Sequence, residues 1–139
     1  MYQFNRKEYE ERMKWYQDAR FGMFIHWGLY ALGARHEWLK NHERIPTEVY
    51  DEKYFKHFDP DLYDPTLWAD AAAEAGMKYF VITTKHHEGF CLWDSKYTDY
   101  KSTNTPCGKD LIREYVDAHG FGDSREVGAL QEMYDRYLV

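Results

Sequence analysis

Two short apolar stretches dominate the pattern of this chain: Phe21-Gly22-Met23-Phe24-Ile25-His26-Trp27 and Lys78-Tyr79-Phe80-Val81-Ile82-Thr83-Thr84. Both have the length and the β-branched or aromatic content of strands, and the first is apolar enough to predict burial on both faces. Between them, Asp64-Pro65 begins an alanine-rich segment that Gly76 ends, which is typical of a capped helix. A strand, a helix and a second strand in this order predict a parallel α/β unit.

Three further helices are indicated by apolar residues at helical spacing. They cover Asn5–Asp18, Asp110–Ala118 with Gly120 as its end, and a tail that opens with a capping box at Asp123–Glu126. The last two helices follow each other without a strand, so the alternation breaks there. Two long connections, residues 29–63 and 85–108, exceed the usual loop length and are expected to carry function or short helices.

Composition excludes several classes of protein. The 139 residues are 44% hydrophobic and 30% charged with a net charge of −6, so nucleic acid is not an expected partner. The apolar stretches are too short to span a bilayer, and no secretory signal opens the sequence. Cys91 and Cys107 lack a Cys-x-x-Cys spacing. We therefore expect a reduced, cytoplasmic protein without a membrane partner.

Polar residues follow both predicted strands at the ends where parallel α/β folds bind ligands. We expect side chains from these ends and from the two long loops to converge: His26, Glu37, His86, His87, Glu88 and Trp93. A single histidine in such a position is more often packed than functional. The coincidence of polar groups at both strand ends favours a site for the set as a whole.

Other site chemistries fit less well. Adjacent residues of an extended strand point to opposite faces, so His86 and His87 are not expected to share one metal ion. The pair His36-Glu37 begins like a zinc-protease helix, but Lys40 stands where the second histidine is needed. Phosphate-binding loops and the serine elbow are also incomplete. No metal and no cofactor are therefore expected.

Aromatic residues make up 19% of the chain, which suits either a large aromatic core or a surface that binds a partly apolar, partly polar ligand. Sugars are such ligands, because their C–H faces stack on rings while their hydroxyls need hydrogen bonds. Neutral imidazoles donate and accept hydrogen bonds and carboxylates accept them, so together they suit the closely spaced hydroxyls of a sugar. Together these residues favour a carbohydrate-binding cleft.

Three motifs carry a resemblance to a known family: Trp15–Gly28, the pair Glu37-Trp38, and Lys85–Phe90 followed by Leu92–Ser95. Together they resemble the family 29 glycoside hydrolases, the α-L-fucosidases, and the likeness is strongest over residues 10–119. It implies that residues 1–139 are the N-terminal portion of a catalytic (β/α)8 TIM-type barrel. The expected fold is α/β, with the first two βα units and a C-terminal helix.

The resemblance also implies hydrolysis of terminal α-L-fucosyl groups with retention, on a fucosylated glycan or fucoside. By it, His26, His86 and His87 hydrogen-bond the fucose hydroxyls. Glu37 contacts the sugar and is a candidate acid/base. Trp93 helps to wall the pocket.

The chain departs from the family pattern in two places. The family's aspartate nucleophile follows a later strand than any matched here, and residues 120–123 stand where a third strand with another fucose contact is normal. We therefore expect a truncated chain that lacks the nucleophile and that self-associates or needs the missing half of the barrel. A non-catalytic sugar-binding or interaction module is the alternative, and a metal-dependent hydrolase is a third hypothesis.

Overall fold

The computed structural model describes residues 3–118, whose centre is a parallel pair of strands. Strand β1 (Met23–Ile25) pairs with β2 (Phe80–Ile82) in the register Phe24↔Val81. Backbone hydrogen bonds continue the pairing on both sides, from Lys78 N–H to the Phe21 carbonyl at 2.8 Å and from Thr83 N–H to the Ile25 carbonyl at 3.0 Å. The predicted α/β unit with two parallel strands is confirmed, although the strands are shorter than the apolar stretches.

The main helices lie where the sequence predicts them, α1 from its helical spacing and α4 from its capping residue. Helix α1 (Arg6–Ala19) is capped by Asn5, and α4 (Pro65–Glu74) is capped by Asp64, whose carboxylate accepts from Thr66 N–H at 2.9 Å and Leu67 N–H at 3.2 Å. Helix α5 spans Leu111–Ala118. The helix predicted after Asp123 lies outside the described residues.

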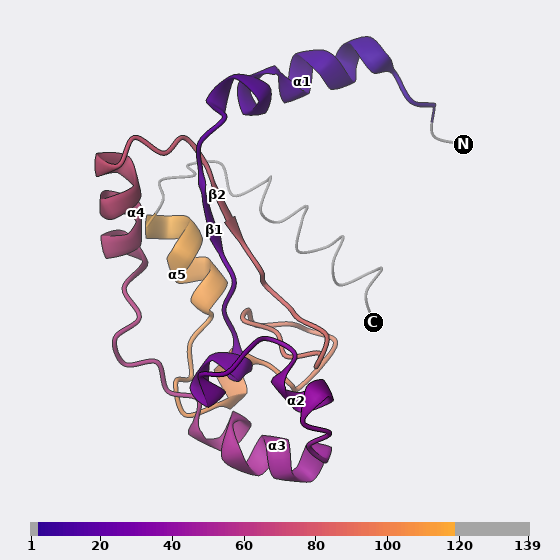
Figure 1. Ribbon diagram of the computed structural model, residues 1–139, viewed down its shortest axis with the longest axis vertical. Helices are drawn as coiled ribbons and strands as arrows, with labels where there is room; N and C mark the ends of the chain where they lie inside the picture. Colours follow the sequence, from indigo (N-terminus) through magenta and orange to yellow (C-terminus); the bar gives the residue numbers. More distant parts are fainter. Residues whose placement is uncertain (1–2, 119–139) are drawn as a thin grey trace.

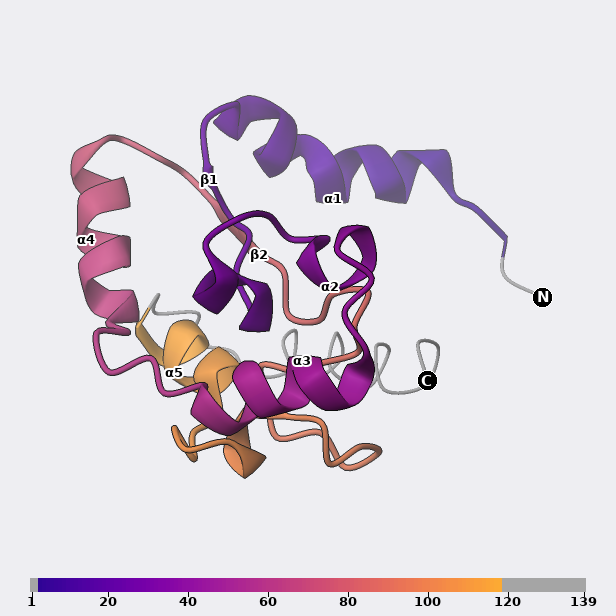
Figure 2. The same cartoon turned by 60° about the horizontal axis from the view of Figure 1, so that its bottom comes forward.

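The helices occupy distinct positions around the strand pair. Helices α4 and α5 lie side by side on one side of the strands, while α2 (Leu39–His42) and α3 (Thr47–Lys53) gather beyond the carboxyl ends of β1 and β2 (Figures 1 and 2). The long connections also contain short 3-10 helices at Leu29–Gly33, Phe55–His57 and Ser102–Asn104. The two loops therefore form an ordered platform at that end of the sheet.

The hydrophobic core is built mainly by these long connections rather than by the strands. Its most buried side chains are Leu29, Leu39, Tyr50, Phe58, Phe90, Leu92 and Leu111. Strand residues Ile25, Phe80 and Ile82 are only partly buried and pack against its edge. The long connections that carry the predicted site are therefore themselves packed into the hydrophobic core.

The strands are not buried on both faces. The composition around β1 is typical of a strand buried on both faces, but two strands without the rest of a barrel were not expected to bury both, and Phe24 is 65% exposed and its neighbour across the sheet, Val81, is 38% exposed. The opposite face packs against the core, and Phe80 contacts the Tyr115 ring of α5 at 6.4 Å. Within residues 3–118 the sheet has two strands, and its face that carries Phe24 and Val81 is exposed.

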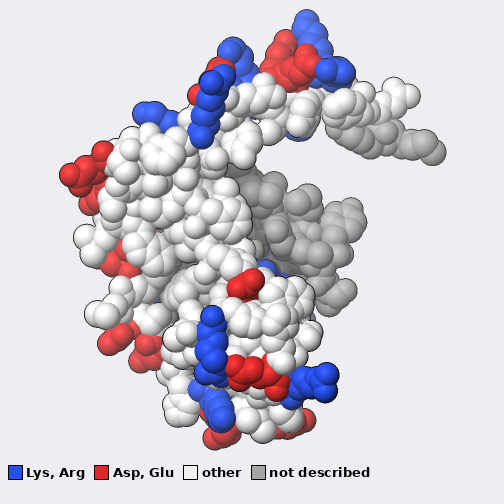
Figure 3. Space-filling model, viewed as in Figure 1, with Lys and Arg blue, Asp and Glu red and all other residues white. Residues whose placement is uncertain are grey.

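Helix α1 projects from the body of the molecule, and none of its residues is buried (Figure 1). Charged side chains crowd its surface (Figure 3), and it carries the i,i+4 ion pairs Arg6–Glu10 and Lys14–Asp18, each at 2.7 Å. Tyr16 contacts the Tyr79 ring at 4.9 Å. Across the described part of the chain, helices are too short or too polar to cross a membrane.

Candidate functional site

The predicted convergence of histidines at the carboxyl ends of the strands is confirmed. His26 directly follows the last residue of β1, and His86 lies four residues after the end of β2. The ring centroids of His26 and His86 are 4.8 Å apart, and those of His86 and His87 are 4.7 Å apart. Tyr30 packs between the first two, 5.4 Å from His26 and 5.1 Å from His86.

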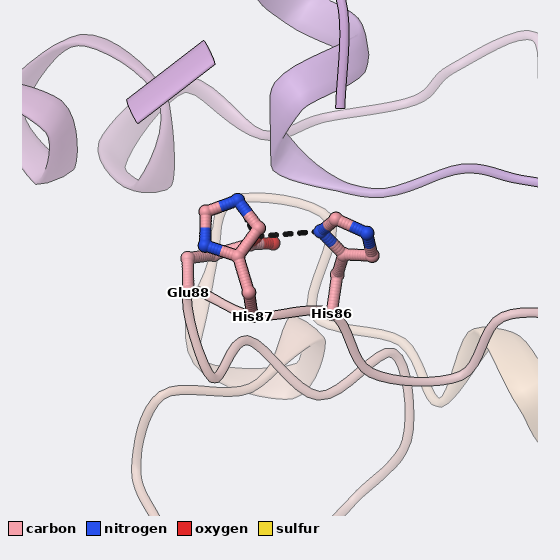
Figure 4. A group of neighbouring side chains, drawn as sticks. All are labelled: His86, His87 and Glu88. Atoms are coloured by element: carbon pink, nitrogen blue, oxygen red, sulfur yellow. Dashed lines mark ion pairs between the residues drawn. The ribbon is translucent and has the colours of Figure 1, made fainter. Parts of the chain in front are cut away.

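A turn determines how His86 and His87 are presented. Strand β2 ends at Ile82, and the Gly89 N–H donates to the His86 carbonyl at 3.0 Å, which closes a turn with Gly89 at φ +89°. The two histidines are therefore not consecutive residues of a strand. The expectation that their side chains point to opposite faces is wrong, and Figure 4 shows both imidazoles on the same side of the turn with Glu88.

Glu88 is the buried acidic member of this group. Its side chain is only 1% exposed, and its Oε2 atom lies 3.5 Å from Nδ1 of His86 and 3.9 Å from Nε2 of His87 (Figure 4). Burial raises the pKa of the Glu88 carboxyl. Burial also lowers the pKa of the His86 imidazole, and the neighbouring His26 acts in the same direction. His86 is therefore neutral at neutral pH, with one ring nitrogen able to donate and the other to accept.

The Glu37-Trp38 pair reaches the same turn from the first long loop. The indole of Trp38 stacks on the His87 imidazole with ring centroids 4.0 Å apart, and it meets His86 edge-on at 5.7 Å. Nε2 of His87 lies 3.2 Å from the Glu37 carbonyl oxygen, to which an imidazole N–H donates. These contacts hold His87 in one orientation.

The Glu37 carboxylate belongs to a pocket beside His26. The pocket is lined by His26, Tyr30, Ala31, Ala34, Arg35, His36 and Glu37. A hydrogen bond from its own backbone N–H, followed by the nearby imidazole of His26, keeps the pKa of the Glu37 carboxyl below its usual range. The group is therefore an ionised hydrogen-bond acceptor at neutral pH.

Trp93 is the one predicted site residue that lies in the hydrophobic core of the described residues. Its side chain is 3% exposed and belongs to the hydrophobic core together with Phe90 and Leu92. Its role as a wall of the sugar pocket remains a prediction. Two further rings lie at the site: Trp38, which the sequence analysis named in a motif without giving it a role, and Tyr30, which it did not name. Trp38 directly follows Glu37, and Tyr30 lies four residues after His26, so proximity to predicted site residues was the available signal.

Two parallel strands that present imidazoles, carboxylates and an exposed indole at their carboxyl ends have the features of a carbohydrate-active α/β enzyme. A family model for α-L-fucosidase matches residues 1–124. The chain belongs to the α-L-fucosidase family of glycoside hydrolases.

Individual relatives agree with this family. An α-L-fucosidase of Dictyostelium discoideum is 37% identical over 122 residues, a match that covers 72% of this chain and 26% of that protein. Among solved structures, α-L-fucosidase isoenzyme 1 from Paenibacillus thiaminolyticus is 65% identical with a TM-score of 0.77, covering 79% of this chain and 26% of the other.

A third relative is a GH29 α-L-fucosidase from Bacteroides thetaiotaomicron, solved as a trapped covalent intermediate with 2-fluoro-fucosyl fluoride. It is 42% identical with a TM-score of 0.74, and the match covers 78% of this chain and 27% of that one. The match thus spans about a quarter of the length of each of these three relatives.

Proposed function

We propose that this chain provides the fucose-hydroxyl-binding part of a retaining α-L-fucosidase. The observation that carries the proposal is the 4.8 Å approach of His26 to His86 at the carboxyl ends of β1 and β2. Parallel strands joined through α4 support the assignment of residues 3–118 to the first two βα units of a (β/α)8 barrel. The alternative, a non-catalytic sugar-binding module, uses the same site without hydrolysis.

Each group at the site has a role that follows from its chemical state. Neutral His86 presents its Nε2 atom to one hydroxyl, because its Nδ1 atom is buried beside Glu88, while His26 and His87 bind neighbouring hydroxyls. The ionised Glu37 carboxylate accepts from a hydroxyl. Its lowered pKa suits this role better than that of a general acid, which needs a raised pKa. The exposed indole of Trp38 contacts the apolar face of the sugar.

The covalent step requires groups that we assign to the rest of the enzyme. A retaining glycosidase uses two carboxylates about 5–5.5 Å apart, one as nucleophile and one as acid/base. We place the nucleophile outside these 139 residues. The exposed sheet face around Phe24 and Val81 supports this division, because further strands of a barrel would cover it. Alone, the chain is expected to self-associate through this face.

A titration of the purified chain with L-fucose tests the proposal. We expect binding to the wild type, a loss of at least about tenfold in affinity for His86→Ala, and no change for His57→Ala, an exposed histidine in the Phe55–His57 segment. Hydrolysis of an aryl α-L-fucoside should be absent. Turnover by the purified chain would show that the nucleophile is misplaced, and equal binding by wild type and His86→Ala would overturn the sugar-site assignment.

A further inference from the structure

We propose that His86, His87 and Glu88 form a binding site for a zinc-class divalent cation, and that this cation competes with the sugar. The evidence for the metal site is the geometry of these three side chains, and it does not depend on the proposed function. The competition rests on the function proposed above, because it requires the same imidazoles to bind fucose hydroxyls.

The three side chains are already arranged as a coordination sphere. Each offers one ligand atom, and the three atoms lie within 4.8 Å of one another. The Glu88 Oε2 atom is 3.5 Å from Nδ1 of His86 and 3.9 Å from Nε2 of His87. Ligands of a tetrahedral zinc ion are about 3.3–3.5 Å apart, given metal–ligand bonds of about 2.0–2.1 Å. Small side-chain rotations would bring all three atoms to that spacing.

Two of the ligand atoms are buried without hydrogen-bond partners. Oε2 of Glu88 and Nδ1 of His86 are shielded from solvent, and neither has such a partner among the residues that the structure describes. Buried polar atoms of this kind are rare in folded proteins unless a ligand, an ion or a water satisfies them. A cation between the carboxylate and the two imidazoles would satisfy both atoms at once.

The third ligand is preoriented by its neighbours. Trp38 stacks on the His87 ring, and Nε2 of His87 faces the Glu37 carbonyl oxygen at 3.2 Å. On metal binding through Nε2, the neutral ring takes its other tautomer: the proton that Nε2 donates to the carbonyl is lost to solvent, Nδ1 takes up a proton from solvent, and the Nε2 lone pair bonds to the metal. Coordination therefore replaces one hydrogen bond, and a rotation of the His87 ring turns Nε2 from the carbonyl oxygen toward Glu88.

The donor set selects the class of metal. Two imidazole nitrogens and one carboxylate oxygen suit Zn²⁺ and its transition-metal neighbours, whereas Mg²⁺ and Ca²⁺ prefer oxygen ligands alone. Three protein ligands leave a fourth position for water, as in open zinc sites. A bound cation with its water would lie against the His86 and His87 rings and beside the His26 ring, which is 4.8 Å from His86, in the space that a sugar bound to these rings needs. Sugar and metal are therefore mutually exclusive.

Isothermal titration of the chelator-treated chain with ZnCl2 tests the metal site. We expect one Zn²⁺ per chain, no heat with MgCl2, and at least about tenfold weaker binding for Glu88→Gln and His86→Ala. His42→Ala is the matched control, because His36 and His42 form a second imidazole pair with ring centroids 4.4 Å apart. The control should bind as the wild type does. Circular dichroism verifies that each variant is folded. If His86→Ala does not fold, the zinc affinity of the nearly isosteric Glu88→Gln decides the result.

The results of the zinc and fucose titrations test the metal site and the proposed sugar-binding function separately. Absence of zinc binding, unchanged affinity in Glu88→Gln, or a loss confined to His42→Ala overturns the metal site. Saturating Zn²⁺ should weaken L-fucose binding at least about tenfold, and simultaneous binding overturns the competition. Zinc binding in a chain that does not bind fucose contradicts the proposed function and leaves the metal site standing.

Discussion

The indole of Trp38 lies parallel to the imidazole of His87, with the ring planes inclined by 5° and the centroids 4.0 Å apart. The pair joins the first long loop to the turn after β2, and the indole remains 40% exposed. One ring therefore orients a histidine and also presents an apolar surface to a ligand.

Replacement of this ring should weaken sugar binding without unfolding the chain. Stacking between rings contributes about 0.5–1.5 kcal/mol, so Trp38→Ala is expected to lower L-fucose affinity about two- to tenfold. Trp38→Phe should recover part of the loss, because it restores a stacking surface. Calorimetric titration measures the affinities, and wild-type affinity in Trp38→Ala would exclude a role for the stack.

Leu39 should be critical for the stability of the platform. It is fully buried next to the site residues Glu37 and Trp38, and a Cβ atom on Gly33 would approach its Cδ2 atom to 2.2 Å, so the packing around it is tight. Leu39→Ala is expected to reduce the free energy of unfolding by about 2–5 kcal/mol through lost contacts and a cavity. The same substitution at Leu62, which is 91% exposed, is the control. Urea denaturation that gives equal midpoints for the two variants would contradict this packing.

Buried tyrosines should make the fold sensitive to alkali. Burial raises the pKa of Tyr30 and of Tyr115 to about 12, above the unfolded value of about 10. A raised folded pKa stabilises the native state below pH 10, and this stability is lost as the pH rises from about 10 toward 12.

A spectroscopic pH titration measures this effect. Tyrosinate absorbance from the buried rings should appear together with the loss of the native circular dichroism signal. Ionisation of all tyrosines near pH 10 with an unchanged dichroism spectrum would show that the rings are accessible to solvent.

The exposed face of the sheet should drive self-association. Phe24 and Val81 are neighbours across the parallel pair and form an apolar surface. Phe24→Lys combined with Val81→Lys should shift sedimentation-velocity profiles toward the monomer, because charges oppose contact between apolar faces. Leu62→Lys, on an exposed side chain elsewhere, is the control. Association that persists in the double variant would place the contact on another surface.

Local signals predicted much of the fold. Asp64 caps the helix that follows it, because a side-chain oxygen next to free backbone N–H groups acts within one turn of chain. The convergence of His26 and His86 was also predictable, since parallel strands bring their carboxyl ends to one edge of the sheet. Both predictions needed only short-range chemistry and one rule of topology.

Features that depend on distant contacts were not predictable. The turn closed by Gly89 reorients His86 and His87, and strand periodicity does not extend to it. The stack of Trp38 on His87 joins residues 49 positions apart.

The hydrogen-bonded alignment of Ile25 with Ile82 determines how the two halves of the recognition site meet. A one-residue slip would move β1 by about 3.3 Å and turn His26 to the other side of the sheet, away from His86. Insertions or deletions within residues 21–26 should thus be far less tolerated than exchanges of single side chains there. The register of these two short strands sets the distance between the His26 and His86 rings, and the proposed sugar site depends on that distance.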